Sequence, residues 1–82
     1  MTRRYRVTIS RKEGLSDPEG STTMRALVDL GFRDVEHVSF GRVITLDLAV
    51  DDDATGLAQV DAMCAKLLAN PVMEEYTVEA IP

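Results

Sequence analysis

Alternating apolar and polar residues predict β-strands at both ends of the chain. Tyr5, Val7 and Ile9 occupy every second position near the start, and arginine, threonine or serine stands between them. Tyr76 and Val78 repeat the pattern near the end. This period of two is typical of a strand with one face turned to a core.

Two further alternating segments lie in the middle of the chain. Val38 and Phe40 alternate with polar residues, and after Gly41-Arg42 the alternation resumes over residues 44–50. Two such segments joined by a glycine-containing turn predict a β-hairpin.

The first helix is predicted between these strands. Asp17 is a suitable N-cap, Pro18 suits the first helical position, and Gly31 is the expected C-terminal stop. The apolar residues at helical spacing are Met24, Leu27 and Val28.

The second helix is predicted after the acidic run 51–53, which complements the positive end of the helix dipole. Asn70-Pro71 ends it, because asparagine tolerates the left-handed conformation and proline cannot continue a helix. The stripe facing the core is predicted to be Leu57, Val60, Cys64, Leu67 and Leu68.

The order strand, helix, strand, strand, helix, strand predicts an α+β fold. We expect one domain over residues 1–82 with a ferredoxin-like βαββαβ topology, in which both helices cover one face of an antiparallel sheet. The other face is predicted to be mixed in polarity, so a partner is expected to cover part of it. It would carry Arg4, Arg6, Thr8, His37, Ser39, Val43, Thr45, Asp47 and Ala49.

Composition narrows the function classes. A net charge of −5 disfavours nucleic-acid binding, which needs an excess of lysine and arginine. We find no signal-peptide pattern and no apolar run of the roughly 20 residues that span a bilayer, and the single cysteine excludes an internal disulfide. A cytoplasmic location is therefore expected.

A chain of 82 residues has a small core, so a dimer or tetramer is expected as well.

No residue set predicts catalysis, cofactor binding or metal binding in this chain. Cys64 lies on the apolar stripe of a helix, and the only histidine, His37, lies on the polar side of a predicted strand, so Cys64 is interpreted as a core residue rather than a nucleophile. The aspartates at 51–53 are interpreted as helix capping, because adjacent residues at a helix start do not converge on one cation. The five glycines are dispersed, and only Gly56 lacks a turn or helix-end explanation.

Three motifs occur in order along almost the whole chain: 15–20 (LSDPEG) with Ala26-Leu27 and Gly31, 38–42 (VSFGR), and 63–76 (MCAKLLANPVMEEY). In order and spacing they resemble the PurS family, the small subunits of phosphoribosylformylglycinamidine synthase. Arg42 stands where the family usually has lysine, and Glu19 where glutamine is common.

The resemblance implies a role in the fourth step of purine biosynthesis. The complete enzyme converts formylglycinamide ribonucleotide, ATP and glutamine into formylglycinamidine ribonucleotide, ADP, phosphate and glutamate. PurS-like subunits have no catalytic residues. They dimerise and join a glutaminase subunit to a synthetase subunit, so that ammonia passes between the two sites; ATP and magnesium are expected on the synthetase. The motif positions with an expected structural or interface role are Asp17, Pro18, Gly20, Gly41, Arg42, Leu67, Asn70 and Pro71.

The residues leave one alternative open. The loop from Gly14 to Gly20 is also compatible with a small-molecule sensor of the same topology, in which the loop frames a ligand between dimer mates. The sequence does not separate a dimer from a tetramer, and it does not show which surface meets which partner.

Overall fold

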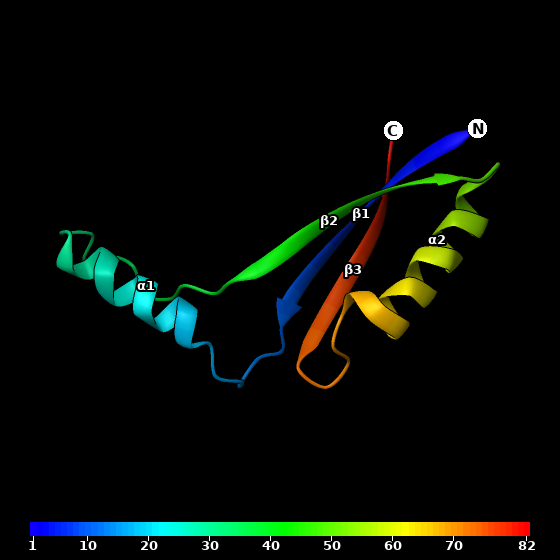
Figure 1. Ribbon diagram of the computed structural model, residues 1–82. Coiled ribbons are helices and arrows are strands. Elements are labelled where there is room, and N and C mark those ends of the chain that lie inside the picture. Colours follow the sequence, from blue (N-terminus) through cyan, green and yellow to red (C-terminus); the bar gives the residue numbers. More distant parts are fainter.

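The computed structural model describes all 82 residues and contains one antiparallel sheet and two α-helices (Figure 1). A five-residue π-helical turn, η1, continues the second helix. The elements are β1 (Thr2–Arg11), α1 (Pro18–Asp29), β2 (Gly41–Ala49), α2 (Asp53–Met63), η1 (Cys64–Leu68) and β3 (Glu74–Ile81).

The sheet has the strand order β2-β1-β3, with β1 antiparallel to both neighbours. Val7 lies opposite Ile44 on one side and Val78 on the other, so these apolar residues of the three strands share one face. The predicted phase of each strand is confirmed, because Tyr5, Val7 and Ile9 are fully buried there.

Helix α2 covers this apolar face by packing against β1 and β3. The buried core consists of Tyr5, Val7, Ile9, Leu48, Val60, Cys64 and Ala69. The contact is close at Gly56, where a Cβ would overlap the Tyr5 hydroxyl and ring. Gly56 is therefore explained by helix–sheet packing.

The α+β class and the antiparallel sheet are confirmed, but the predicted hairpin is wrong in one respect. Residues 35–40 form no strand, and Gly41-Arg42 is the start of β2 rather than a turn. The backbone before β2 is engaged elsewhere: the Phe40 N–H donates to the Asp17 carboxylate at the start of α1. The sheet consequently has three strands within the chain.

The position of α1 is a second correction. Instead of lying beside α2, α1 and the chain that returns from it project beyond the end of the sheet (Figure 1). We call residues 15–40 the arm and the sheet with α2 and η1 the body. None of the core residues comes from the arm, and the molecule measures 50 × 27 × 14 Å.

The ends of α1 follow the predicted signals. Asp17 is the N-cap and Pro18 the first helical residue. Gly31 has φ +107°, its N–H donates to the Val28 carbonyl, and the Phe32 N–H donates to the Leu27 carbonyl. This pair of bonds is the Schellman arrangement, so Gly31 is confirmed as the helix stop.

The end of the second helix differs from its prediction. No residue other than glycine has a positive φ, so Asn70 does not end the helix in a left-handed conformation. Helical geometry instead widens into η1 after Met63, and the chain is extended at Ala69. A π turn holds more residues than an α turn and so shifts the helix face. Leu67, predicted to face the core, is 82% exposed as a result, whereas Leu68 packs against the core.

Candidate functional site

The base of the arm is held by the first group of predicted motif residues. The Asp17 carboxylate accepts from the Gly20 N–H and from the Phe40 N–H, each at 2.9 Å. It thereby joins the start of α1 to the chain entering β2. Gly20 is buried under the Val38 carbonyl, where a Cβ would overlap that oxygen. These contacts hold the outgoing and returning segments of the arm together at its base.

Electrostatics favour the ionised form of this cap. The backbone N–H of Gly20, and then that of Phe40, lowers the pKa of Asp17 below its ordinary value. Both bonds are to the charged form, so they persist at neutral pH.

Arg42 makes a specific intramolecular contact. Its guanidinium binds the Glu74 carboxylate through two bonds, 2.7 and 3.1 Å long, and donates a third at 2.8 Å to the Leu68 carbonyl. Glu74 also accepts from the Asn70 N–H at 2.8 Å. We call these four residues the clamp. It ties the start of β2 to the start of β3 and to the end of η1.

The remaining turn residues close the segment between η1 and β3. The Asn70 side-chain oxygen accepts from the Val72 N–H at 3.0 Å, a local turn that asparagine favours. The Lys12 ammonium donates to the Pro71 carbonyl at 2.7 Å, and the Lys12 N–H donates to the Met73 carbonyl. Asn70 and Pro71 therefore have structural roles in this turn.

The arm base and the clamp lie at the same end of the sheet, since Gly41 and Arg42 are neighbours at the start of β2. Gly41 is opposite Ser10 and leaves no room for a Cβ against the Ile9 carbonyl. A small cavity of about 250 Å³ beside the clamp is lined by Arg11, Arg42, Asn70, Met73 and Glu74. Among the predicted motif residues, Leu67 alone lies outside this region. Leu67 also makes no contact that explains its place in the motif.

The candidate nucleophile lies in the core. Cys64 is fully buried, and burial, with a smaller contribution from Asp61, raises the pKa of its thiol. His37 lies on the exposed return segment of the arm. The structure thus places the two residues apart and gives the thiol no activating base.

The acidic run caps α2, as predicted. Asp52 accepts from the Thr55 N–H at 2.7 Å, and Asp53 accepts from the Tyr5 hydroxyl at 3.2 Å. No group of three or more His, Cys, Asp or Glu side chains is placed to hold a metal ion.

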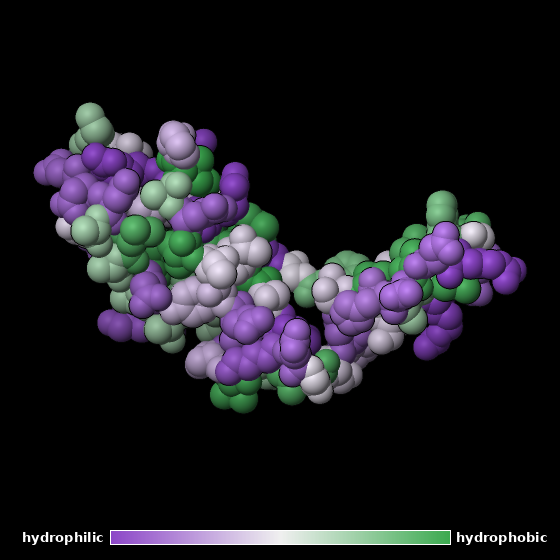
Figure 2. All heavy atoms as spheres, turned by 180° about the vertical axis from the view of Figure 1, so that it is seen from behind, coloured by the Kyte–Doolittle hydropathy of each residue, from purple (hydrophilic) through white to green (hydrophobic).

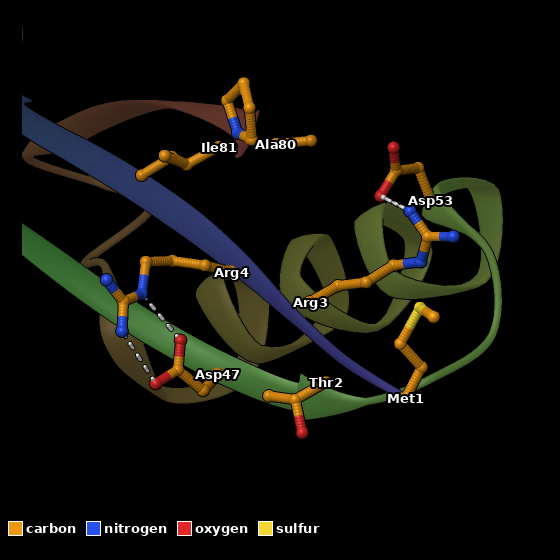
Figure 3. A pocket seen from close by; sticks show the side chains of 9 residues that line it. Met1, Thr2, Arg3, Arg4, Asp47, Asp53, Ala80 and Ile81 are labelled. Carbon is orange, nitrogen blue, oxygen red and sulfur yellow. Dashed lines mark hydrogen bonds and ion pairs between the residues drawn. The ribbon is translucent and has the colours of Figure 1, made fainter.

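A cavity of about 550 Å³ lies near the two chain ends (Figure 3). Its charged side chains are paired: Arg3 with Asp53, and Arg4 with Asp47 through two bonds. Arg4 is the main cause of the lowered pKa of Asp47. The loop 14–20, considered for ligand binding, lines neither this cavity nor the one beside the clamp.

An apolar groove beside α2 was not predicted. It has a volume of about 560 Å³ and lies between the inner side of β2 and the outer side of α2 and η1. Sequence analysis missed it because Leu67 was assigned to the core and because α1 was expected to cover this part of the sheet. We call it the groove; it is lined by Leu46, Gln59, Ala62, Met63, Lys66, Leu67 and Leu68.

The chain resembles known proteins over nearly its whole length. The profile of the PurS family, described as phosphoribosylformylglycinamidine (FGAM) synthase, matches residues 4–82. The chain belongs to the PurS family. The synthase subunit PurS of Archaeoglobus fulgidus is 42% identical, covering 88% of this chain and 90% of that protein. The Bacillus subtilis subunit PurS is 36% identical, covering 93% and 89%.

Solved PurS structures share the fold. A Bacillus subtilis PurS structure superposes with a TM-score of 0.86 at 34% identity and covers all of both chains. A chain in the structure of PurLQS from Thermotoga maritima superposes with a TM-score of 0.91 at 26% identity and covers 99% of both chains. The predicted family is confirmed, and with it the assignment as a subunit of FGAM synthase. No helix of this PurS chain has the length and apolar content to cross a membrane.

Proposed function

We propose that this PurS chain is the assembly subunit of a multi-subunit FGAM synthase. It pairs with itself and joins a glutaminase subunit to an ATP-dependent synthetase subunit in the cytoplasm. ATP and magnesium bind to the synthetase subunit, and the ligase reaction takes place there. The observation that carries the proposal is the superposition, over 99% of the chain, on a chain of the PurLQS structure from Thermotoga maritima.

The physical benefit of such a subunit is proximity. Ammonia released by a glutaminase becomes protonated and diluted if it enters solvent, whereas a held assembly delivers it to the second site as a nucleophile. The side chains of this PurS chain support that role, because its charged groups form ion pairs and turn contacts rather than a convergent reactive site.

Reconstitution tests the proposal. FGAM formation is measured with the glutaminase and synthetase subunits, with and without this chain, using glutamine or excess ammonium as the nitrogen source. We expect omission to remove most of the glutamine-dependent rate and to spare more of the ammonium-dependent rate. An unchanged glutamine-dependent rate on omission would refute the assembly role.

A further inference from the structure

Arg11 is the one arginine of the body that forms no ion pair. The other body arginines, Arg3, Arg4, Arg6 and Arg42, each bind a carboxylate. Arg11 is exposed at the last position of β1, and it lines the cavity of about 250 Å³ beside the clamp. A guanidinium presents its N–H donors in a planar fork, so this side chain is free to bind a further acceptor.

Arg11 is unpaired because the carboxylate across from it is already occupied. Glu74 lies directly opposite Arg11 in the pairing of β1 with β3. Its two oxygens accept instead from the Arg42 guanidinium, at 2.7 and 3.1 Å, and from the Asn70 N–H at 2.8 Å. The Arg42 bond is the main cause of the lowered pKa of Glu74, and Arg11 adds only the effect of its charge.

The clamp therefore keeps the Arg11 guanidinium available. Arg42 holds Glu74 through two bonds to one carboxylate, the geometry of the stronger ion pairs in proteins. A carboxylate held in this way does not turn toward Arg11. The cavity consequently contains two guanidinium groups and one carboxylate, an excess of one positive charge.

The cavity lies at the junction from which the arm projects. Arg11 ends β1, and its neighbour Ser10 is paired with Gly41, the first residue of β2. Arg11 is also within electrostatic range of the Asp17 carboxylate, which already accepts from two backbone N–H groups. Hydrophilic atoms border this junction, where the molecule is narrow (Figure 2). A side chain of another protein can therefore reach Arg11 from solvent.

The size and charge of the cavity favour a carboxylate side chain as its occupant. Sites for small-molecule ligands usually measure about 300–1,000 Å³ and are mostly apolar. This cavity is smaller, and Met73 is the one hydrophobic residue among the five that line it. A phosphate group carries close to two negative charges, which is more than the excess of one positive charge balances. A carboxylate carries a single charge, and its two oxygens match the fork of a guanidinium.

We propose that Arg11 binds a carboxylate side chain of another subunit of FGAM synthase, which enters the cavity between the clamp and the base of the arm. The inference rests on the proposed function and deepens it by assigning a contact surface and its chemistry. Permanent interfaces between identical chains are the more hydrophobic ones, so a cavity with polar walls suits a contact with a different subunit. A single charged contact of this kind contributes specificity and orientation.

Titration of this chain into a mixture of the glutaminase and synthetase subunits tests the contact. The readout is the chain concentration that gives half of the maximal glutamine-dependent rate. Arg11→Gln should raise this concentration about tenfold at about 0.05 M salt and leave the maximal rate unchanged. The difference should shrink at about 0.5 M salt, because salt screens an exposed ion pair.

Arg25→Gln is the matched control. Arg25 is exposed on α1 and forms no ion pair, so the substitution removes the same charge at a distance from the cavity. The control should behave as the wild type in the titration. Light scattering and urea unfolding of Arg11→Gln should give the wild-type mass and midpoint, because Arg11 has no ion pair to lose within the chain.

Zero-length cross-linking identifies the protein that supplies the carboxylate. Arg11→Lys places a primary amine in the cavity, and a carbodiimide condenses an amine with a carboxylate in contact to form an amide. Mass spectrometry of the treated complex should find residue 11 joined to an aspartate or glutamate of the glutaminase or the synthetase. Arg25→Lys carries the same amine on the arm and should not form this link.

Three results would each overturn the contact. They are equal half-maximal concentrations for Arg11→Gln and Arg25→Gln, a link from residue 11 that reaches only Glu74 of the same chain, and a link that reaches only a second copy, seen as a covalent dimer. These failures differ from failure of the proposed function. A chain that is required for glutamine-dependent synthesis but insensitive to Arg11→Gln overturns only the contact. A chain that is dispensable for synthesis overturns the assembly role, and cross-linking still reports whether residue 11 meets another subunit.

Discussion

The body and the arm are built from the same kinds of residues, yet only the body has a core. Tyr5, Val7 and Ile9 of the body are fully buried, whereas in the arm only Gly20 is buried. The body gains its stability from apolar side chains removed from water. The arm is instead held by polar contacts at its base, chiefly those of Asp17. One chain therefore combines a part that folds by burial with a part whose apolar side chains remain available to another surface.

Truncating apolar side chains should separate the two parts most clearly. Ile9→Ala removes a side chain that is 1% exposed, and we expect a loss of about 2–5 kcal/mol in the free energy of unfolding. Leu30→Ala, at an exposed position of the arm, should change it by less than about 0.5 kcal/mol. Urea unfolding of the chain carrying either change, at one fixed protein concentration, measures both losses. Equal losses for the two substitutions would refute the division into body and arm.

A second comparison uses two buried glycines. Gly56→Ala places a Cβ against Tyr5 beneath α2 and should destabilise the body by about 1–3 kcal/mol. Gly20→Ala places a Cβ against the Val38 carbonyl and should loosen α1 while the body keeps its unfolding midpoint. Urea unfolding reports the first effect, and hydrogen exchange of α1 reports the second. A lowered body midpoint in Gly20→Ala would show that the arm and the body unfold as one unit.

The sequence predicted the body better than the arm for a physical reason. Period-two alternation depends only on which side of a strand is buried, so the inner faces of β1 and β2 were predicted correctly. Phe40 also alternates with its neighbours, but a strand needs a hydrogen-bonding partner, and its N–H bonds instead to Asp17. Leu67 was misplaced because the widening of the helix into η1 has no signal in the apolar spacing. The groove was not predictable, since it exists only because α1 lies elsewhere.

Acid should loosen the base of the arm. Hydrogen bonds from backbone N–H groups lower the pKa of Asp17, so the stabilisation is complete above the ordinary range of an aspartate and is lost as the pH falls through the lowered pKa. In Asp17→Ala the backbone amides of residues 20 and 40 should exchange fast already at neutral pH. Lowering the pH should then change their exchange only as much as the intrinsic exchange rate changes. Hydrogen exchange by NMR checks both statements, and the β1–β2 amides serve as the internal control. Unaltered protection at residues 20 and 40 would contradict this role of Asp17.

The smallest effect is expected at Arg42, where the motif resemblance led us to expect lysine. Arg42→Lys keeps the charge beside Glu74, but an ammonium group cannot reproduce the two parallel bonds to the carboxylate together with the bond to the Leu68 carbonyl. We expect faster exchange in residues 69–73 without a measurable change in the unfolding midpoint at neutral pH.

Arg42 is the main cause of the lowered pKa of Glu74, so the substitution should also bring that pKa nearer its ordinary value and shift the loss of the clamp to a higher pH. Arg6→Lys is the matched control, because Arg6 makes one bond of 3.1 Å to Glu79 at the surface. If the two substitutions leave residues 69–73 equally protected, lysine holds this turn as well as arginine does, and the clamp depends on charge rather than on the shape of the guanidinium.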